Sequence, residues 1–590
     1  MGLESRQSQA IARLYWSSLA VNQAPFALFA VFFLNWAPIA WAADATGSMN
    51  RPSAQTLPLP DYVPRQPAES FTLPPLPESE ANSLDRRILA VKHIQIEGNS
   101  LFPEADLRAM LQAYEGREVS VAELEELRLK LTRYYIDHGY VNSGAIIPQD
   151  AYRDGELRIK IIEGRIEAVR VRGTERLREG YVSNRLVAEP DKPFNLQELQ
   201  DNYQILLSDP LISRINGRIL PGATAGSSIL DLDVTRAQPY QLSVFGNNQR
   251  PPSIGAEAFG LNGLLRNLTG LGDSLDFTYI TSAGSNRYSG GFSLPITDAG
   301  TQAFFHFDEG DSMVLEQQIS NLNISSVVHS LEGGFSHPLI NTMARRLSVG
   351  ALLAVRENQT YLLGQPYSFV PGEPTGRNQA TVWRLFQDFN QRWDNHALAL
   401  HSGFSVGMNA LGATPPRSVP AGLSSVYQQY PSSEFFAWLG QGQYAWRMLE
   451  DGTQLVLRGS AQFSDSPLLP LERIAVGGFN TVRGYRENQL VRDAGYSVSG
   501  ELHYPLIGAG DPKAGHRLTL VPFIDYGEAW YVGQAAQATS LFSIGAGLEW
   551  QLKPVRIDFY YGYALNTPKP RQSGDLQDDG IHFNARWDLL

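Results

Sequence analysis

The stretch RLTLVPFIDYG, residues 517–527, alternates between two sets of side chains, and this alternation decides the fold of the C-terminal part of the chain. A period of two residues is typical of a β-strand whose two faces meet different surroundings. One phase is apolar and consists of Leu518, Leu520, Pro522, Ile524 and Tyr526. The other phase consists of Arg517, Thr519, Val521, Phe523, Asp525 and Gly527. Because the first phase suits lipid, we expect Asp525 to face the water-filled interior of a membrane β-barrel.

The same alternation recurs throughout residues 238–590, where turns rich in Gly, Asn, Asp and Ser separate the alternating stretches. Their apolar phases are Leu275, Phe277 and Tyr279; Leu347, Val349 and Ala351; Leu455, Leu457 and Gly459; Val498, Gly500, Leu502, Tyr504 and Leu506; and Ile557, Phe559, Tyr561 and Tyr563. At roughly twenty-two residues for each strand and its connection, this region predicts a transmembrane β-barrel of about sixteen antiparallel strands. A soluble β-sandwich is the alternative, but it rarely runs this long as one unit.

A second motif, Val482-Arg483-Gly484-Tyr485, lies about forty residues before Asp525 and follows the glycine-rich approach of residues 475–480. Glycines allow the backbone to fold sharply. An arginine fork matches a carboxylate through two hydrogen bonds, as lysine cannot. We therefore expect this loop to fold back into the barrel, where Arg483 meets Asp525. A solvated surface arginine is the alternative interpretation.

The residues next to Asp525 in its strand support the same arrangement. Phe523 offers a stacking surface and Gly527 leaves room for the incoming loop. Together the expected contacts form what we call the barrel-loop lock, whose members are Val482, Arg483, Gly484, Tyr485, Phe523, Asp525 and Gly527.

Composition and charge narrow the classes of function. The 590 residues carry a net charge of −12, which argues against a nucleic-acid partner, since nucleic acid selects a basic surface. The chain has no cysteine, which suits passage through an oxidising compartment such as the bacterial periplasm. The sequence predicts neither catalytic residues, nor a metal site, nor a cofactor: its ten histidines are scattered, and no nucleophile elbow or phosphate loop occurs. The run Asp308-Glu309-Gly310-Asp311 lacks the spacing of a calcium loop and is interpreted as a solvated turn.

The N-terminus predicts export from the cytoplasm. Arg6 and Arg13 precede an apolar run at residues 25–34, and Ala40-Trp41-Ala42 has the small-x-small pattern of a cleavage site. We interpret residues 1–42 as a secretory signal peptide rather than an uncleaved anchor helix. Residues 43–88 are a proline-rich linker, interpreted as a passive spacer, with a pore-threading plug as the alternative.

Two tandem copies of the order β-α-α-β-β follow, at residues 89–164 and 165–237. In the first copy an amphipathic helix contains Leu124, Leu127 and Leu131 and ends before Gly139. In the second copy Asn195 caps the corresponding helix. An internal repeat of this length predicts two α+β domains in series.

Each copy resembles the polypeptide-transport-associated (POTRA) domain. The first copy is similar to the first such domain of two-partner secretion pores at Tyr135, Gly139, Tyr140, Pro148 and Gln149. The resemblance implies that these residues serve partner docking. Packing is the other interpretation for Gly139 and Tyr140, and the docking function then lies in the open strand edge that this packing presents.

The two C-terminal motifs resemble the hallmark motifs of the outer-membrane assembly and secretion superfamily. With two POTRA-like domains before them, the mature chain resembles its haemolysin activation/secretion branch of two-partner secretion transporters. This resemblance implies a pore in the outer membrane of a Gram-negative bacterium, with its POTRA domains in the periplasm. It implies export of a large β-rich exoprotein with an N-terminal secretion domain. It also implies contact with outer-membrane lipid, and insertion of the pore itself by periplasmic chaperones and the barrel assembly machinery.

Other functions remain as alternatives. A barrel-insertion factor of the same superfamily usually has more POTRA repeats. An outer-membrane enzyme needs clustered Asp/His or Ser/His groups, and a passive porin needs no periplasmic domains. The chain also departs from the usual aromatic end of outer-membrane barrels, since Leu590 ends it and the apolar phase falls on Leu589.

Overall fold

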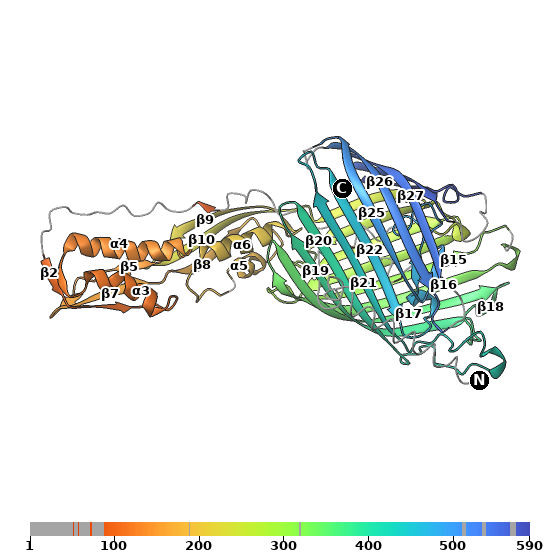
Figure 1. Cartoon of the computed structure of the whole chain (residues 1–590), viewed down its shortest axis with the longest axis horizontal. Helices are drawn as coiled ribbons and strands as arrows, with labels where there is room; N and C mark the ends of the chain where they lie inside the picture. Colours follow the sequence, from red (N-terminus) through yellow and green to blue (C-terminus); the bar gives the residue numbers. More distant parts are fainter. Residues whose placement is uncertain are drawn as a thin grey trace, which may run out of the picture.

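The computed structural model describes residues 51, 57, 71–72, 88–187, 189–317, 320–509, 515–533, 538–566 and 574–590. The predicted signal peptide and most of the predicted linker lie outside the described residues. Two small α+β units extend in series from one end of a large β-barrel (Figure 1). No described helix is long and apolar enough to cross a membrane.

The first unit contains the predicted order β-α-α-β-β together with three short strands that the sequence did not predict. Its elements are β2 (Ile88–Val91), β3 (His93–Glu97), α3 (Glu104–Leu111), the 3₁₀ turn η3 (Gln112–Tyr114), β4 (Arg117–Ser120), α4 (Val121–Asp137), β5 (Gly144–Ile146), β6 (Tyr152–Arg153) and β7 (Glu156–Ile162), of which β2, β4 and β6 are the three unpredicted strands. Ser120 caps α4 in a capping box with Glu123, as the Ser-x-x-Glu spacing favours. Helix α4 buries Leu124, Leu127 and Leu131 against the sheet β3-β7-β5.

The second unit repeats this plan with β8 (Arg165–Arg172), α5 (Glu179–Leu186), α6 (Leu196–Leu207), β9 (Ile212–Pro221) and β10 (Ser227–Arg236). Its sheet has the order β1-β9-β10-β8, in which the two-residue β1 (Phe71–Thr72) pairs in parallel with β9. This pairing lies inside the predicted linker, where the sequence predicts no strand. Strands pair through backbone hydrogen bonds, and a two-residue strand is too short to show an alternating pattern in the sequence.

Polar contacts join the two units to each other and to the barrel. The Asn195 side chain donates to the carbonyl of His138, and Asn142 donates to the carbonyl of Gly226. At the barrel end of the second unit, Asn184 donates to Asp298 at 2.9 Å. The Arg178 backbone N–H donates to the carbonyl of Gly270 in the barrel turn at residues 267–273.

Within the described residues the barrel has sixteen antiparallel strands and closes where β11 meets β29. The strands are β11 (Tyr240–Asn247), β12 (Ala258–Arg266), β13 (Ser274–Ser282), β14 (Ser285–Pro295), β15 (Gln302–Met313), β16 (Ser325–Asn341), β17 (Arg345–Leu362), β19 (Arg377–Arg392), β20 (His396–Met408), β21 (Phe436–Arg447), β22 (Gln454–Ser464), β25 (Ala494–Ile507), β26 (His516–Trp530), β27 (Thr539–Leu552), β28 (Val555–Ala564) and β29 (Ile581–Asp588). The two-residue β18 (Gln365–Pro366) pairs only with the end of β17.

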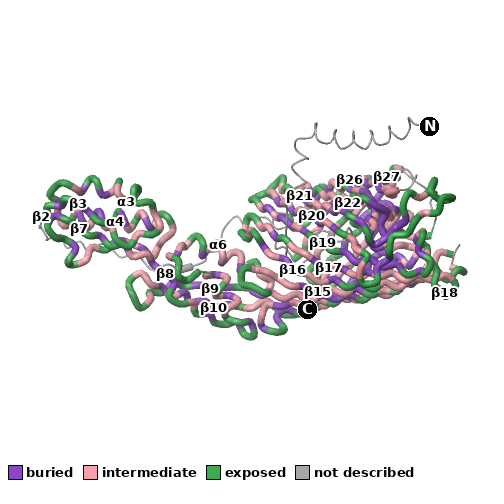
Figure 2. Tube along the Cα trace, turned by 90° about the horizontal axis from the view of Figure 1, so that it is seen from below, coloured by how far each residue is buried: buried purple, intermediate pink, exposed green. Residues whose placement is uncertain are grey.

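The wall has the predicted two faces. Phe277, Val498, Ile524 and Tyr561 are among the large apolar side chains exposed on the barrel, whereas Asp525 is fully buried. Connections at the end near the α+β units are short, such as residues 342–344 and 393–395, and most of those at the far end are longer, such as residues 409–435 and 465–493. This asymmetry is typical of outer-membrane barrels. Figure 2 shows the buried residues gathered toward the far end of the barrel.

The interpretation of Asp308-Glu309-Gly310-Asp311 as a turn is wrong. These residues lie within strand β15, and Asp308 pairs with Arg287 at 2.6 Å. A strand accommodates this polar run because Asp308 belongs to the polar inner face of the barrel, whereas Glu309 and Asp311 are exposed near the far end of β15. At the chain end, Leu590 follows β29, and the Leu589 N–H donates to the carbonyl of Leu242 on β11.

Candidate functional site

The loop between β22 and β25, residues 465–493, forms the candidate site. It contains the 3₁₀ turn η7 (Pro470–Glu472), β23 (Ile474–Val476) and β24 (Leu490–Arg492), which pairs with β23. The remaining short turns η4 (Pro252–Ile254), η5 (Ser320–Leu322) and η6 (Ala421–Leu423) lie in other connections. The four motif residues 482–485 are all buried, so the loop folds back into the barrel rather than lying on its surface.

Arg483 and Asp525 form a two-pronged ion pair. Arg483 Nε lies 2.8 Å from Asp525 Oδ2, and Arg483 Nη2 lies 2.8 Å from Asp525 Oδ1. The backbone N–H of Arg483 also donates to Asp525 Oδ2 at 3.0 Å. Both residues are nearly inaccessible, with exposed fractions of 3% and 0%. A buried charge is stable only when it is paired and hydrogen-bonded, and this geometry meets that condition.

A second carboxylate and two aromatic rings complete the surroundings of Arg483. Glu501 Oε1 lies 2.8 Å from Arg483 Nη1. The guanidinium carbon lies 3.7 Å from the ring centre of Phe523 and 5.0 Å from that of Tyr560. Such stacking adds a cation–π attraction to the ion pair. Neither Glu501 nor Tyr560 was predicted from the sequence, although the alternation of β25 already places Glu501 on the inner face.

Gly484 brings the loop backbone against the last strands. Its φ of +88° is a left-handed conformation that glycine adopts without strain. A β-carbon there would lie 2.7 Å from the carbonyl oxygen of Gly562 on β28. The Gly484 N–H donates to His582 Nε2 on β29 at 3.1 Å. His582 is therefore a further contact of the loop that the sequence analysis did not single out.

The flanking motif residues fill matching spaces. A β-carbon on Gly527 would lie 2.9 Å from Val482 Cγ2, so Gly527 provides the room expected of it. Val482 and Tyr485 pack in one apolar cluster with Val476 and Leu541. The Tyr485 hydroxyl lies 2.6 Å from Asn566 Oδ1. The structure thus brings all seven residues of the barrel-loop lock together.

In the first α+β unit, Tyr135 is buried and Gln149 is exposed, whereas the predicted docking residues Gly139, Tyr140 and Pro148 are half-buried. Tyr135 is fully buried and its hydroxyl donates to Asn99 Oδ1 at 2.8 Å. Burial raises the pKa of the Tyr135 phenol well above its ordinary value, and the nearby Glu163 carboxylate adds to this shift. Tyr140 packs within 6.3 Å of the Tyr135 ring centre. Tyr135 and Tyr140 therefore shape the unit from within.

The other predicted docking residues lie nearer the surface. Gly139 has a φ of +90°, and its carbonyl accepts from Leu196 of the second unit. Pro148 follows the edge strand β5, and Gln149 beside it is exposed. Among the described residues, no group of three or more His, Cys, Asp or Glu side chains could hold a metal ion.

Comparison with known proteins identifies the family. The family described as "Haemolysin secretion/activation protein ShlB/FhaC/HecB" matches residues 226–550, and the "POTRA domain, ShlB-type" matches residues 89–164. The chain belongs to this haemolysin secretion/activation family. The barrel of sixteen strands, the POTRA domain at its N-terminal side and the outer-membrane location predicted from the sequence are thereby confirmed.

Individual relatives agree with this assignment. The outer membrane transporter CdiB of Dickeya dadantii is 22% identical over 72% of this chain and 74% of its own length. The heme/hemopexin transporter protein HuxB of Haemophilus influenzae is 22% identical over 88% of this chain and 91% of its own. The solved structure of CdiB from Escherichia coli superposes with a TM-score of 0.65 at 19% identity, and covers 87% of this chain and 93% of that one. This structural likeness concerns the fold.

Proposed function

We propose that this protein is an outer-membrane pore that exports one large, β-rich exoprotein from the periplasm to the cell surface by two-partner secretion. The observation that carries the proposal is the 465–493 loop, which folds into the barrel and is fastened there through Arg483 and Asp525. Family membership and transporter relatives such as the hemolysin transporter protein ShlB of Serratia marcescens support the same function.

The two α+β units supply the entry side of the pore. They lie at the end of the barrel with short turns, which is the periplasmic end in outer-membrane barrels (Figure 1). In the first unit β3 and β5 are the edges of the sheet β3-β7-β5. The exoprotein would dock its N-terminal secretion domain on such an edge by β-augmentation, in which backbone hydrogen bonds supply affinity. Tyr135, Gly139, Tyr140 and Pro148 would hold that edge in place, with the exposed Gln149 beside it.

The barrel-loop lock would keep the loop in one position within the lumen while the exoprotein passes. Asp525 lies on strand β26 of the barrel wall and Arg483 lies on the 465–493 loop. Their ion pair therefore joins the loop to the wall. Removing Arg483 would leave the Asp525 carboxylate charged, buried and without its ionic partner, which costs about 3–5 kcal/mol.

We assign no catalytic activity to the chain, and the energy for export would come from folding of the exoprotein outside the cell. The apolar outer face would contact outer-membrane lipid. Periplasmic chaperones and the barrel assembly machinery would insert the barrel itself. Its last strand, β29, is followed by Leu589 and the non-aromatic Leu590.

The surface and supernatant proteome of the native host tests this function. Strains lacking the gene are complemented with wild type, with Arg483→Ala, or with Arg153→Ala, a matched change at an exposed arginine. We expect one large protein to disappear and to return with wild type and Arg153→Ala only. Loss of many outer-membrane barrels would instead indicate an insertion factor, and an unchanged proteome would contradict export.

A further inference from the structure

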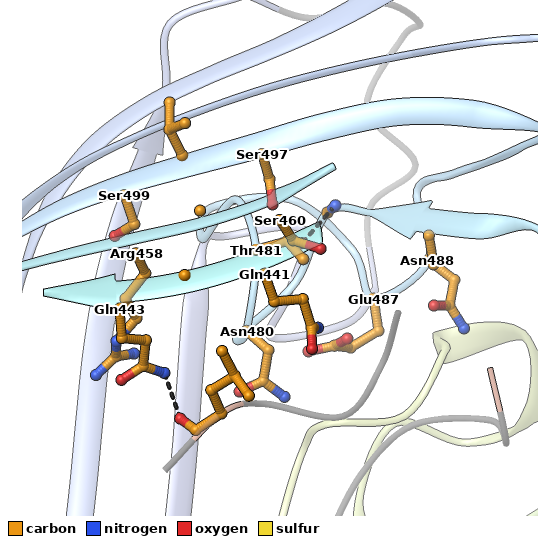
Figure 3. A pocket seen from close by; sticks show the side chains of 16 residues that line it. Gln441, Gln443, Arg458, Ser460, Asn480, Thr481, Glu487, Asn488, Ser497 and Ser499 are labelled. Carbon is orange, nitrogen blue, oxygen red and sulfur yellow. Dashed lines mark hydrogen bonds between the residues drawn. The ribbon is translucent and has the colours of Figure 1, made fainter. Parts of the chain in front are cut away.

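A polar cleft lies between the inner wall of the barrel and the 465–493 loop. Its wall side consists of residues from three neighbouring strands, β21, β22 and β25, and its loop side includes Asn480, Thr481 and Asn488. The cavity volume of the cleft is about 70 Å³. Figure 3 shows these side chains converging from the wall and from the loop.

The strand register arranges the wall side chains in two rows. Gln443 is opposite Arg458, which is opposite Ser499. Gln441 is opposite Ser460, which is opposite Ser497. Five of these six side chains are uncharged amides or hydroxyls, so the wall offers hydrogen-bond donors and acceptors without a strong charge.

Two polar atoms of this wall lack a hydrogen-bond partner among the described residues. They are the hydroxyl oxygen of Ser460 and the Nε of Arg458, and both atoms are buried. Arg458 uses another nitrogen, Nη2, to pair with Glu501 at 3.2 Å. Buried polar groups in proteins are nearly always hydrogen-bonded, so these atoms point to a polar occupant of the cleft.

One backbone group already occupies the cleft. Gln443 Nε2 donates to the backbone carbonyl oxygen of Leu57 at 2.5 Å, the contact drawn as a dashed line from Gln443 in Figure 3. Farther along the same loop, Arg51 Nε donates to the carbonyl of Pro470 at 3.4 Å. Leu57 and Arg51 belong to the predicted passive spacer, yet both lie inside the barrel. The cleft therefore accepts main-chain groups of a segment that does not belong to the wall.

We propose that this cleft is a binding track for extended polypeptide backbone, and that the exported chain follows it past the barrel-loop lock. The inference rests on the proposed export function and adds the route within the lumen. Gln443 is its principal donor, and Gln441, Ser460 and Ser497 continue it. Leu57 shows the mode of binding that the exported chain adopts when it takes the same place.

The chemistry of the wall suits a chain of any sequence. Every residue other than proline presents one N–H and one C=O, and glutamine and serine side chains both donate and accept. Contacts to the backbone therefore do not depend on which side chain passes. Each neutral hydrogen bond is weak enough to be exchanged for the next one, which allows movement along the row.

The row formed by Gln443, Arg458 and Ser499 ends at the barrel-loop lock. Ser499 is opposite Asp525 in the register of β25 and β26, and its hydroxyl lies 2.9 Å from Arg483 Nη2. The lock thus holds the loop side of the cleft at a fixed separation from its wall side. Displacement of the loop would widen the cleft and separate its two polar faces.

The absence of cysteine from the chain makes the track directly testable. Single-cysteine variants Gln441→Cys and Ser460→Cys of the full chain are placed in planar lipid bilayers, with Ser289→Cys on the inner face of β14 as control. The probe is a peptide of about forty Gly, Ser, Asn and Thr residues with one central cysteine, a composition that stays unfolded. Current blockades report entry of the peptide, and disulfide formation reports its route.

We expect disulfides at positions 441 and 460 and none at position 289. We also expect Gln443→Met, which keeps the side-chain size, to shorten blockades about fivefold, the equivalent of about 1 kcal/mol for one hydrogen bond. Gln387→Met, on the outward face of β19, should leave them unchanged. Current blockades accompanied by equal disulfide formation at positions 441, 460 and 289 would overturn the track and leave export intact. The same holds for blockades without disulfides at positions 441 and 460. A peptide that never blocks the current would contradict both the track and the proposed function.

Discussion

Glu472 and Arg384 form an ion pair of 2.6 Å between the start of the 465–493 loop and strand β19, while Arg483 of the same loop pairs with Asp525 on β26. Glu472 also lies 3.5 Å from Arg356 on β17, and Glu332 on β16 pairs with Arg356 at 2.7 Å. The loop is therefore fastened to two separate parts of the barrel wall. Its position does not depend on the barrel-loop lock alone.

Breaking the lock should impair export without unfolding the barrel. In Arg483→Ala the Asp525 carboxylate stays buried without its ionic partner, at a cost of about 3–5 kcal/mol. In Asp525→Ala the loop loses its link to β26, and Arg483 keeps only the ion pair with Glu501. Arg483→Lys should fail as well, because an ammonium cannot make both hydrogen bonds to Asp525. Exoprotein in the culture supernatant measures export, and heat-modifiable gel migration measures barrel folding. Normal secretion by both alanine variants would show that the lock is dispensable.

The second attachment predicts a different effect. Glu472→Gln keeps the size of the side chain but removes the carboxylate charge that pairs with Arg356 and Arg384, while both arginines keep their ion pair with Glu332. We expect faster hydrogen exchange across residues 468–476, with little change around Arg483. Glu357→Gln breaks the more exposed pair with Arg377 and serves as the control, since such pairs contribute about 1 kcal/mol or less. Equal exchange in the two variants would refute a separate attachment.

Close backbone packing predicts that Gly484 tolerates no side chain. Gly484→Ala places a β-carbon 2.7 Å from the Gly562 carbonyl oxygen and strains the φ of +88°. The loop must then move away from β28, and we expect a loss of export comparable to that of Arg483→Ala. Gly263→Ala on β12 is the matched control, because no heavy atom lies within 4 Å of its added β-carbon. Export by Gly484→Ala at the control rate would contradict this close approach.

The first α+β unit should be needed for docking but not for the channel. Deletion of residues 89–163 removes the sheet β3-β7-β5 and leaves β8 to β29 intact. We expect the exoprotein to lose its affinity for the pore in a pull-down, while channel conductance in planar bilayers remains. Unchanged affinity would place docking elsewhere in the chain.

Much of this architecture was predictable from local patterns. The alternation of residues 517–527 shows which side chains share a face of one strand. Repetition of that pattern along the chain predicts a barrel of about sixteen strands. The spacing of Leu124, Leu127 and Leu131 predicts helix α4 because a helix brings these positions to one side. Arg483 and Asp525 could be paired because each is the one charged residue of its motif, and because Asp525 lies in the inward phase of its strand.

Local sequence patterns were enough to predict which residues face inward and which chain segments repeat, since periods of 2 and 3.6 residues follow from backbone geometry. Which inward residues meet depends on the three-dimensional arrangement of the strands and loops. Glu501 joins Arg483, His582 receives the Gly484 N–H, and Glu472 reaches Arg384, because barrel closure and loop position bring distant strands together. The places of Arg51 and Leu57 depend on hydrogen bonds in which at least one partner is a backbone carbonyl. Every residue has that group, so no sequence pattern marks the contact.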